Sequence, residues 1–314
     1  MVQETPAPAP THDMLDRLEK FFRHYLHCTP DQRTVLQLWA LHTHCFAAAG
    51  ATPYLFIHSP EKQSGKTLCL QLLGLLCADS WFASAVTPAI LVGKVTAQRP
   101  TVLLDDCHTI FSPAARARTC ALLMNGARRG GTFSLSKRNA IQDFDVFCPK
   151  ALAGDFLLPQ NIVEHFIPIA LVQNFDYGFF RKFRLGEASA MAAPLVESMK
   201  AWAVANLDAL MQAAPFSYDD VELISSPREQ DCLEPLFQIA CLLGSDWPSR
   251  LAAALNRIHS LLRRWGIEVR NQRHDCGERG QGYDRNDFTI HFNAWLPEHD
   301  ARMDARFDGP LLLE

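Results

Sequence analysis

The decisive stretch of this 314-residue chain runs from Pro53 to Cys77 and reads PYLFIHSPEKQSGKTLCLQLLGLLC. Its first seven residues are mostly apolar, which is typical of a strand that is buried on both faces. The residues from Gly65 to Cys77 are almost all apolar over a helical length, which predicts a buried helix. A short polar turn separates the two segments, so the sequence predicts a strand, a tight loop and a helix in succession.

The turn has the residue types that bind phosphate groups, which need clustered backbone N–H groups, a helix N-terminus and a lysine. Gly65 would let the backbone approach the phosphates, Lys66 would reach the β and γ phosphates, and the Thr67 hydroxyl would help to hold Mg²⁺. The usual motif begins with glycine where this chain has Pro60, and a bare Gly-Lys-Thr also occurs at ordinary helix starts. The predicted nucleotide-binding residues are Pro60, Glu61, Lys62, Gln63, Ser64, Gly65, Lys66, Thr67 and Leu68.

A second apolar segment, residues 101–106, reads TVLLDD, and it predicts a strand over 101–105 that leads into two carboxylates. In a parallel nucleotide-binding sheet such a strand ends beside the phosphate-binding loop, so Asp105 is expected to hold Mg²⁺ through its water shell. Asp106 is expected to polarise the attacking water, which makes Asp106 and Lys66 the predicted catalytic residues. The alternative is a strand that ends in solvated carboxylates without a ligand.

Strand-like and helix-like segments alternate along the middle of the chain. The other expected strands are 82–86, 150–154 and 165–172, with a hairpin at 130–147. The other expected helices begin at Asp13, at Asp31 as an N-cap (31–48), after Thr87 as an N-cap, and at Ser112-Pro113, with two long ones at 190–213 and 229–265. This alternation predicts an α/β fold in which helices flank both faces of a mostly parallel five-stranded sheet.

The pattern also predicts a division of the chain into five parts. These are a Pro/Ala-rich tail (1–12), amino-terminal helices (13–50), the core with the loop (51–186), a helical region (187–265), and a small strand-containing region with the final tail (266–314).

Net charge, cysteine content and hydropathy argue against several classes of protein. The net charge is −4, so the chain as a whole is no electrostatic nucleic-acid binder, and any such surface must be local. The ten cysteines include no Cys-x-x-Cys pair, which favours reduced thiols packed as small apolar residues. No stretch approaches the ~20 apolar residues of a membrane-spanning helix, and the first ten residues do not form an export signal. We therefore expect a cytoplasmic protein with no membrane partner.

Many short motifs carry a resemblance to one family. They are Leu38–His44, Ser59–Lys62, Gly65–Thr67, Leu103–Asp106, Cys148–Gly154, Leu158-Pro159, Asp231, Glu234–Leu236, Ile239-Ala240, Gly244, Trp247-Pro248 and Gly282-Tyr283. With them the chain resembles the bacterial and phage family of mobile-element P-loop ATPases catalogued as domain of unknown function 3631. The resemblance implies an AAA+ or RecA-like ATPase core that uses ATP and Mg²⁺. It also implies a homo-oligomer that works with replication or mobile-element proteins of plasmids and prophages.

Two positions depart from that family. The second acidic residue is usually Glu and is Asp106 here, and an Asp-Arg pair is replaced by Glu164-His165. A carboxylate that is one methylene shorter holds a water differently, and a missing arginine removes a cation that stabilises a transferring phosphoryl group. Hydrolysis is therefore expected to be slow. The alternative is a degenerate member that binds nucleotide as a structural or switching ligand.

Other charged residues have positions that suit this class of ATPase. Asp155 follows the expected strand 150–154, where such proteins place a residue that senses the γ-phosphate. Arg128, Arg129, Lys137 and Arg138 surround the expected hairpin, and three of them (Arg128, Arg129 and Arg138) are candidate arginine fingers toward a neighbouring subunit. A solvated basic surface is the alternative. Cys107 and His108 follow Asp106, yet no partners for thiol chemistry can be named, and we expect no nucleophile there.

The carboxy-terminal part is locally basic, with eight arginines against four acidic residues between Ser249 and Arg285. A helix followed by short strands and a Gly-rich turn suits a small winged-helix-like unit that contacts DNA phosphates. The alternative is an accessory domain with an arginine-rich exterior. The candidate nucleic-acid-binding residues are Arg263, Arg264, Arg270, Arg273 and Arg279.

Overall fold

The computed structural model describes residues 11–59, 61–137, 140–173, 182–219, 221–223, 225–244 and 246–264. Two compact units divide the chain, Met1–His259 and Ser260–Glu314. The sheet and the helices described below belong to the first unit, up to His259. The part predicted as a basic strand-containing region (266–314) lies outside the described residues.

A parallel sheet of five strands forms the centre of the first unit, in the order β2-β3-β6-β1-β7. Its strands are β1 (Tyr54–His58), β2 (Ser80–Ser84), β3 (Thr101–Asp105), β6 (Lys150–Gly154) and β7 (Phe166–Ala170). Every residue of β1 and β6 is buried, as expected of strands covered on both faces. The prediction of an α/β fold with a parallel sheet flanked by helices is confirmed at this level.

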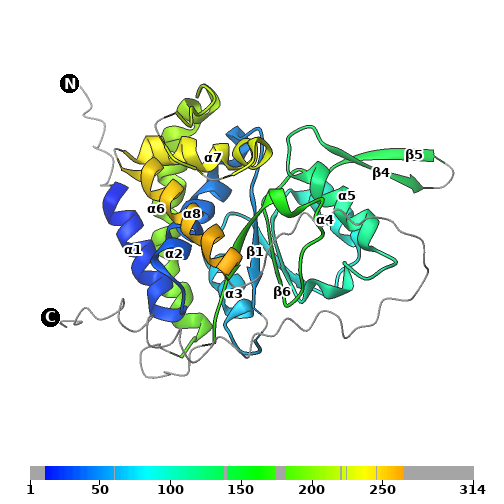
Figure 1. Ribbon diagram of the computed structural model, residues 1–314, viewed down its shortest axis with the longest axis horizontal. Helices are drawn as coiled ribbons and strands as arrows, with labels where there is room; N and C mark the ends of the chain where they lie inside the picture. The colour runs from blue at the N-terminus through cyan, green and yellow to red at the C-terminus, as the bar shows by residue number, and fades with distance from the viewer. Residues whose placement is uncertain are drawn as a thin grey trace. The chain divides into compact units, whose positions relative to one another are not determined.

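Helices cover both faces of the sheet (Figure 1). On one face α3 (Lys66–Leu76) packs against β1, β2, β3 and β6, and a helical layer covers it in turn. This layer contains α1 (Thr11–Tyr25), α2 (Pro30–Cys45), α6 (Leu185–Met211), α7 (Pro227–Leu243) and α8 (Trp247–Arg264). On the other face α4 (Pro88–Gln98) and α5 (Arg116–Gly126) share an apolar core with β1, β3, β6 and β7. A separate antiparallel hairpin, β4 (Thr132–Lys137) and β5 (Ala140–Asp145), extends beyond α5.

Several helix boundaries differ from the prediction, for example those of α6, which runs from Leu185 to Met211 and not over 190–213. Three of the differences have a clear cause. The N-cap of α2 is Thr29 and not Asp31, because Thr29 and Gln32 exchange side-chain-to-backbone hydrogen bonds in a capping box, with Pro30 in the first turn. The segment expected as one helix over 229–265 is two helices. It breaks at Gly244, whose φ of 110° lies outside the helical range.

The third boundary is the start of α5. Ser112 begins a turn in which its carbonyl accepts from the N–H groups of Ala115 and Arg116, and the helix itself begins at Arg116. By contrast, Thr87 caps α4 as predicted, since its side chain accepts from the N–H of Ile90 at 3.3 Å.

A buried lysine lies at the amino end of β6. Lys150 is fully buried, and its ammonium donates to the carbonyls of Val146 (2.9 Å) and Cys148 (3.0 Å) and to the hydroxyl of Tyr54 (3.0 Å). Burial lowers the pKa of Lys150. A Cβ added at Gly126 would lie 2.5 Å from the Val146 carbonyl oxygen and 2.8 Å from the Lys150 ammonium. Glycine at position 126 is therefore needed for this close packing.

The described cysteines are reduced and mostly buried. Every cysteine in the described residues except Cys241 is buried, and none of these cysteines forms a disulfide. This agrees with the prediction that the thiols pack as small apolar residues.

Among the helices that the structure describes, none is long and apolar enough to cross a lipid bilayer.

Candidate functional site

The loop between β1 and α3, residues 59–65, lies at a switch point of the sheet. After β1 the chain runs through α3 to the far edge strand β2, whereas after β6 it crosses over the other face to β7. Adjacent strands whose connections leave in opposite directions leave a crevice at their carboxyl ends, and ligands of open α/β sheets bind there. The predicted phosphate-binding residues therefore occupy the position in this fold that is best suited to a ligand.

The loop is a tight turn with two residues in left-handed conformations. Gln63 has a φ of 60° and Gly65, the N-cap of α3, has a φ of 94°. Side-chain hydrogen bonds close the turn, because Ser64 Oγ donates to the Glu61 carbonyl (3.3 Å) and Ser59 Oγ accepts from the Glu61 N–H (3.1 Å). Glycine at position 65 thus satisfies a backbone requirement that most residues meet only with strain. Pro60 is outside the described residues.

Lys66 folds back over this loop. Its ammonium donates to the carbonyls of Ser59 (3.1 Å) and Glu61 (2.8 Å). Burial lowers the pKa of Lys66, and the nearby charges of Asp155, Asp105 and Glu61 act in the opposite direction. The lysine is thus held inside the loop by neutral acceptors, which anionic phosphate oxygens would replace favourably.

The loop and the carboxylate-bearing strand meet through Thr67 and Asp105. The Thr67 hydroxyl, in the first turn of α3, donates to Asp105 Oδ2 at 2.7 Å, although β6 lies between β3 and β1, the strand that leads into the loop. Asp105 Oδ1 also accepts from the N–H of Asp106 at 3.0 Å. The structure thus places the two predicted metal-binding residues in direct contact.

The Thr67–Asp105 pair fits Mg²⁺ that arrives with a nucleotide. Both groups are oxygen ligands, which Mg²⁺ prefers, and in nucleotide sites one or two carboxylates suffice because phosphates and waters complete the shell. Within the described part of the chain, no group of three or more His, Cys, Asp or Glu side chains could hold a metal by itself. The arrangement therefore suits a metal that the protein and a nucleotide bind together better than a metal that protein side chains bind alone.

Asp106 pairs with His108, for which the sequence predicts no role. Its Oδ1 lies 2.5 Å from Nδ1 of His108, and both side chains are largely exposed, at 68% and 58%. The contact depends on the conformation of Asp106, whose φ of 53° and ψ of 55° turn the chain sharply after β3. The only signal in the sequence is a histidine two residues after the second carboxylate.

Asp155 and His58 lie on the other side of Lys66. Asp155 directly follows β6, and its charge acts on both Lys66 and His58. His58 ends β1, and its Nδ1 is buried without a hydrogen-bond partner among the described residues. Burial, with a contribution from Lys66, lowers the pKa of His58 to about 4. Asp155 therefore has the location expected of a sensor, although a sensing role stays a prediction.

Two of the candidate arginine fingers, Arg128 and Arg129, lie near the amino end of β1, whereas Lys66 follows its carboxyl end. Arg128 forms a bridge with Ala51, just before β1, and its guanidinium lies 3.4 Å from Asp231. Arg129 donates to the carbonyls of Ala49 (2.9 Å) and Ala47 (2.5 Å). These contacts hold Arg129 to its own chain, which argues against a free finger. Arg138 is outside the described residues.

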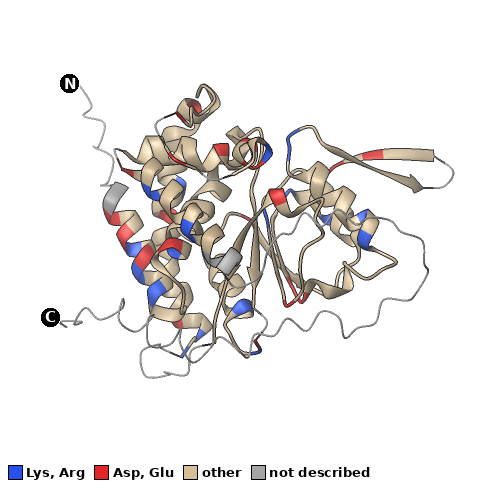
Figure 2. Cartoon of the chain, in the orientation of Figure 1, with Lys and Arg blue, Asp and Glu red and all other residues tan. Residues whose placement is uncertain are grey.

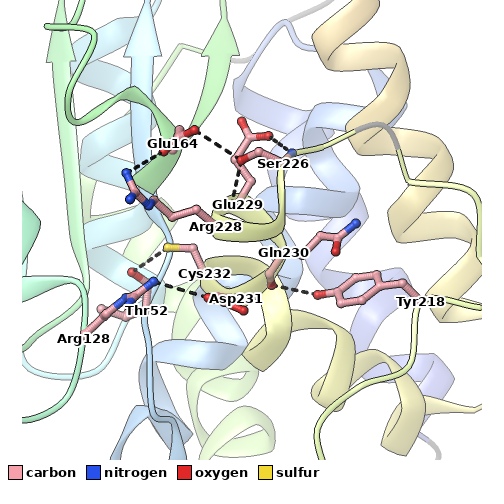
Figure 3. Close-up of polar contacts among 10 residues, drawn as sticks. All are labelled: Thr52, Arg128, Glu164, Tyr218, Ser226, Arg228, Glu229, Gln230, Asp231 and Cys232. Carbon is pink, nitrogen blue, oxygen red and sulfur yellow. Dashed lines mark hydrogen bonds and ion pairs between the residues drawn. The ribbon is translucent and has the colours of Figure 1, made fainter.

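The Glu164-His165 pair lies directly before β7, at the amino end of that strand, and Figure 3 shows Glu164 beside the start of α7. Glu164 accepts from Arg228 and from Ser226 Oγ, each at 3.3 Å, and so ties the start of α7 to the sheet. His165 lines a small cavity with Glu229 and Cys232, and its Nδ1 has no partner among the described residues. Position 165 thus lies at the amino end of β7, whereas Lys66 follows the carboxyl end of the neighbouring parallel strand β1.

The predicted nucleic-acid-binding residues fall at or beyond the end of the described chain. Arg263 and Arg264 are in the last turn of α8, and Arg270, Arg273 and Arg279 lie outside the described residues. Basic and acidic residues are interspersed along α1 and its neighbours (Figure 2), so the helical layer has no face of a single charge there.

Comparisons with known proteins give little. No family model matches the chain, and no curated protein matches it. Among solved structures, the X-ray structure of JCV helicase is similar at 14% identity with a TM-score of 0.32, and its inhibitor-bound form gives the same values. Each match covers 83% of this chain and 62% of the helicase chain, which is less than two thirds of that protein. Similarity at this level assigns neither a fold nor an activity.

Proposed function

We propose that this chain is a Mg²⁺-dependent ATP-binding P-loop ATPase. The observation that carries the proposal is the 2.7 Å contact between Thr67 Oγ1 and Asp105 Oδ2, at the carboxyl ends of a parallel sheet. A hydroxyl at the start of a helix and a carboxylate at the end of a nearby strand are the two protein groups that such sites offer to a nucleotide-bound metal.

Each group of the site has a separate task in this proposal. The N–H groups of the 59–65 loop and of the first turn of α3 bind the phosphates, and the positive end of the α3 dipole favours their charge. Lys66 exchanges the carbonyls of Ser59 and Glu61 for β and γ phosphate oxygens. Mg²⁺, when bound, neutralises charge on the phosphates, and Thr67 and Asp105 fix where it can sit.

The wider role is an extension of this proposal. We infer that the ATPase acts as a homo-oligomer on nucleic acid in plasmid or prophage replication or maintenance, together with replication or mobile-element proteins. The support is the resemblance of motifs such as Leu103–Asp106 and Cys148–Gly154 to the mobile-element ATPase family. The candidate DNA-binding residues are Arg263, Arg264, Arg270, Arg273 and Arg279. Stimulation of ATP hydrolysis by added DNA would support this role, and equal rates with and without DNA would count against it.

Binding of a nonhydrolysable ATP analogue tests the central proposal. We expect Mg²⁺-dependent binding by the wild-type protein and its loss in Lys66→Ala. The matched control is Lys200→Ala, which removes a lysine that pairs with Glu197 on α6. The proposal fails if the analogue does not bind, or if Lys66→Ala binds it as tightly as Lys200→Ala does.

A second candidate is a protein that binds nucleotide without useful turnover and serves as a structural, switching or DNA-binding module. The observation that favours it is Asp106, which is one methylene shorter than the Glu of relatives and whose carboxylate is engaged by His108. Steady ATP hydrolysis that is abolished by Asp106→Ala would exclude this candidate.

A further inference from the structure

Asp106 and His108 form a carboxylate–imidazole pair at the end of β3, next to the Thr67–Asp105 contact. The pair is joined to that contact through the Asp106 N–H, which donates to Asp105 Oδ1 at 3.0 Å. An ionised carboxylate only accepts hydrogen bonds, so the Nδ1 atom 2.5 Å from Asp106 must carry the proton. In the neutral imidazole the other nitrogen, Nε2, is then an unprotonated base.

We propose that His108 is the general base of ATP hydrolysis and that Asp106 positions it. This inference rests on the proposed ATPase function. It explains how a site with a shortened second carboxylate can still activate water, since the imidazole extends the reach of Asp106 by a whole ring. A carboxylate that fixes the tautomer and orientation of a histidine is a recurrent device in hydrolytic sites.

Hydrolysis in this proposal is the attack of a water molecule on the γ-phosphate of ATP. The oxygen of a water attacks the γ-phosphorus, and a proton of that water passes to Nε2 of His108. The bond between the γ-phosphorus and the β–γ bridging oxygen breaks, and its electron pair stays on the β-phosphate of ADP. Asp106 stabilises the imidazolium that forms, and His108 then returns its proton to solvent or to the released phosphate.

The exposure of both side chains agrees with this role and separates it from a purely structural one. At 58% exposure the His108 side chain is open to water, and its pairing with Asp106 contributes little to the stability of a surface turn. Substitution of His108 is therefore expected to leave folding intact and to change only the chemical step.

Steady-state hydrolysis at saturating Mg-ATP, measured beside analogue binding, tests the inference. For His108→Ala we expect kcat to fall about 100-fold, with the dissociation constant of a nonhydrolysable analogue within about twofold of wild type. His108→Asn keeps a donor for Asp106 but has no basic nitrogen, and we expect it to be as slow as His108→Ala. Added imidazole should restore part of the activity of His108→Ala and none of that of Lys66→Ala.

Several results would overturn the inference. One is a kcat for His108→Ala within about twofold of wild type. Another is an active His108→Asn, which would show that His108 only supports Asp106. The third is a wild-type protein that binds the analogue but hydrolyses no ATP. Failure of the ATPase proposal itself looks different, because the wild-type protein would then not bind the analogue at all. Lys200→Ala, which removes only the exposed pair with Glu197 on α6, should keep wild-type rates.

Discussion

Asp105→Asn separates the charge of this side chain from its hydrogen bonds. In the structure Asp105 accepts from the Thr67 hydroxyl at 2.7 Å and from the Asp106 N–H at 3.0 Å. In Asp105→Asn the amide oxygen can accept from the Asp106 N–H and the amide NH₂ can donate to the Thr67 hydroxyl, so the loop and the end of β3 should stay in place. We expect the free energy of unfolding to fall by about 1 kcal/mol, because hydrogen bonds to a charged group contribute about 1.5 to 3 kcal/mol, neutral ones contribute about 1 kcal/mol, and both bonds are exposed here.

The effect on Mg-ATP binding should be larger. A carboxylate that holds Mg²⁺ through a water lies about 4 Å from it, and two unit charges at that distance interact by about 1 kcal/mol in water. For a divalent ion the loss is about 2 kcal/mol, or about a thirtyfold weaker affinity. Without metal the sign reverses, because Asp105 then repels the phosphates, and Asp105→Asn should bind metal-free ATP at least as tightly as wild type.

Isothermal titration with a nonhydrolysable ATP analogue, in Mg²⁺ and again in EDTA, measures both effects on the same samples. Urea unfolding of the same proteins checks that the fold is unchanged. The reasoning is refuted if Asp105→Asn binds the Mg²⁺ complex as tightly as wild type, or if it loses the same affinity in EDTA as in Mg²⁺.

Further predictions concern the fold. Gly126→Ala should lower the free energy of unfolding by about 1 to 3 kcal/mol, because the added Cβ would lie 2.5 Å from the Val146 carbonyl oxygen. Gly93→Ala should raise the free energy of unfolding by about 1 kcal/mol, because Gly93 is inside α4 and the space around its Cβ position is open. Equal effects in urea unfolding would contradict this. Burial lowers the pKa of His42 to about 3 from 6.5, so the unfolded chain binds more protons and wild-type stability should fall by about 2 kcal/mol between pH 7 and pH 5 from this residue. His42→Gln should lose about 2 kcal/mol less over that range, and an identical loss would show that His42 is not the cause. Thr29→Ala should cost about 1 kcal/mol by removing the α2 cap, and no change in thermal unfolding would count against the capping box.

The sequence predicts the central strands well because they are buried on both faces. β3 and β6 have the predicted bounds, because their short buried runs are flanked by residues that mark the ends, Pro100 and Asp105-Asp106 for β3 and Pro149 and Gly154 for β6. β2 begins and ends two residues earlier than predicted. It is an edge strand in which Ser80, Phe82 and Ser84 are exposed, so hydrophobicity alone does not mark its ends.

Helix ends were predicted less well because several residues compete for each cap. Thr29 and Asp31 are both good N-cap types, and only the pairing of Thr29 with Gln32 decides between them. The sequence contains that signal, and it also contains Gly244, at which the segment predicted as one helix breaks into two.

The site could be predicted only in part. The residue types of the loop and of the end of β3 follow from the sequence, but the contact of Thr67 with Asp105 depends on a strand order that no local pattern contains. The pairing of Asp106 with His108 needs a left-handed conformation that few residues other than glycine adopt, so no propensity predicts it. The carbonyls that bind Arg129 come from a segment far away in the chain.

A crystal structure with Mn²⁺ and a nonhydrolysable ATP analogue would test the central claim most directly. We expect an anomalous manganese peak about 2 Å from Thr67 Oγ1, with the phosphates in the 59–65 loop and the Lys66 ammonium moved from the Ser59 and Glu61 carbonyls onto them. Nucleotide bound elsewhere, with the Thr67–Asp105 hydrogen bond and both Lys66 contacts intact, would contradict the account.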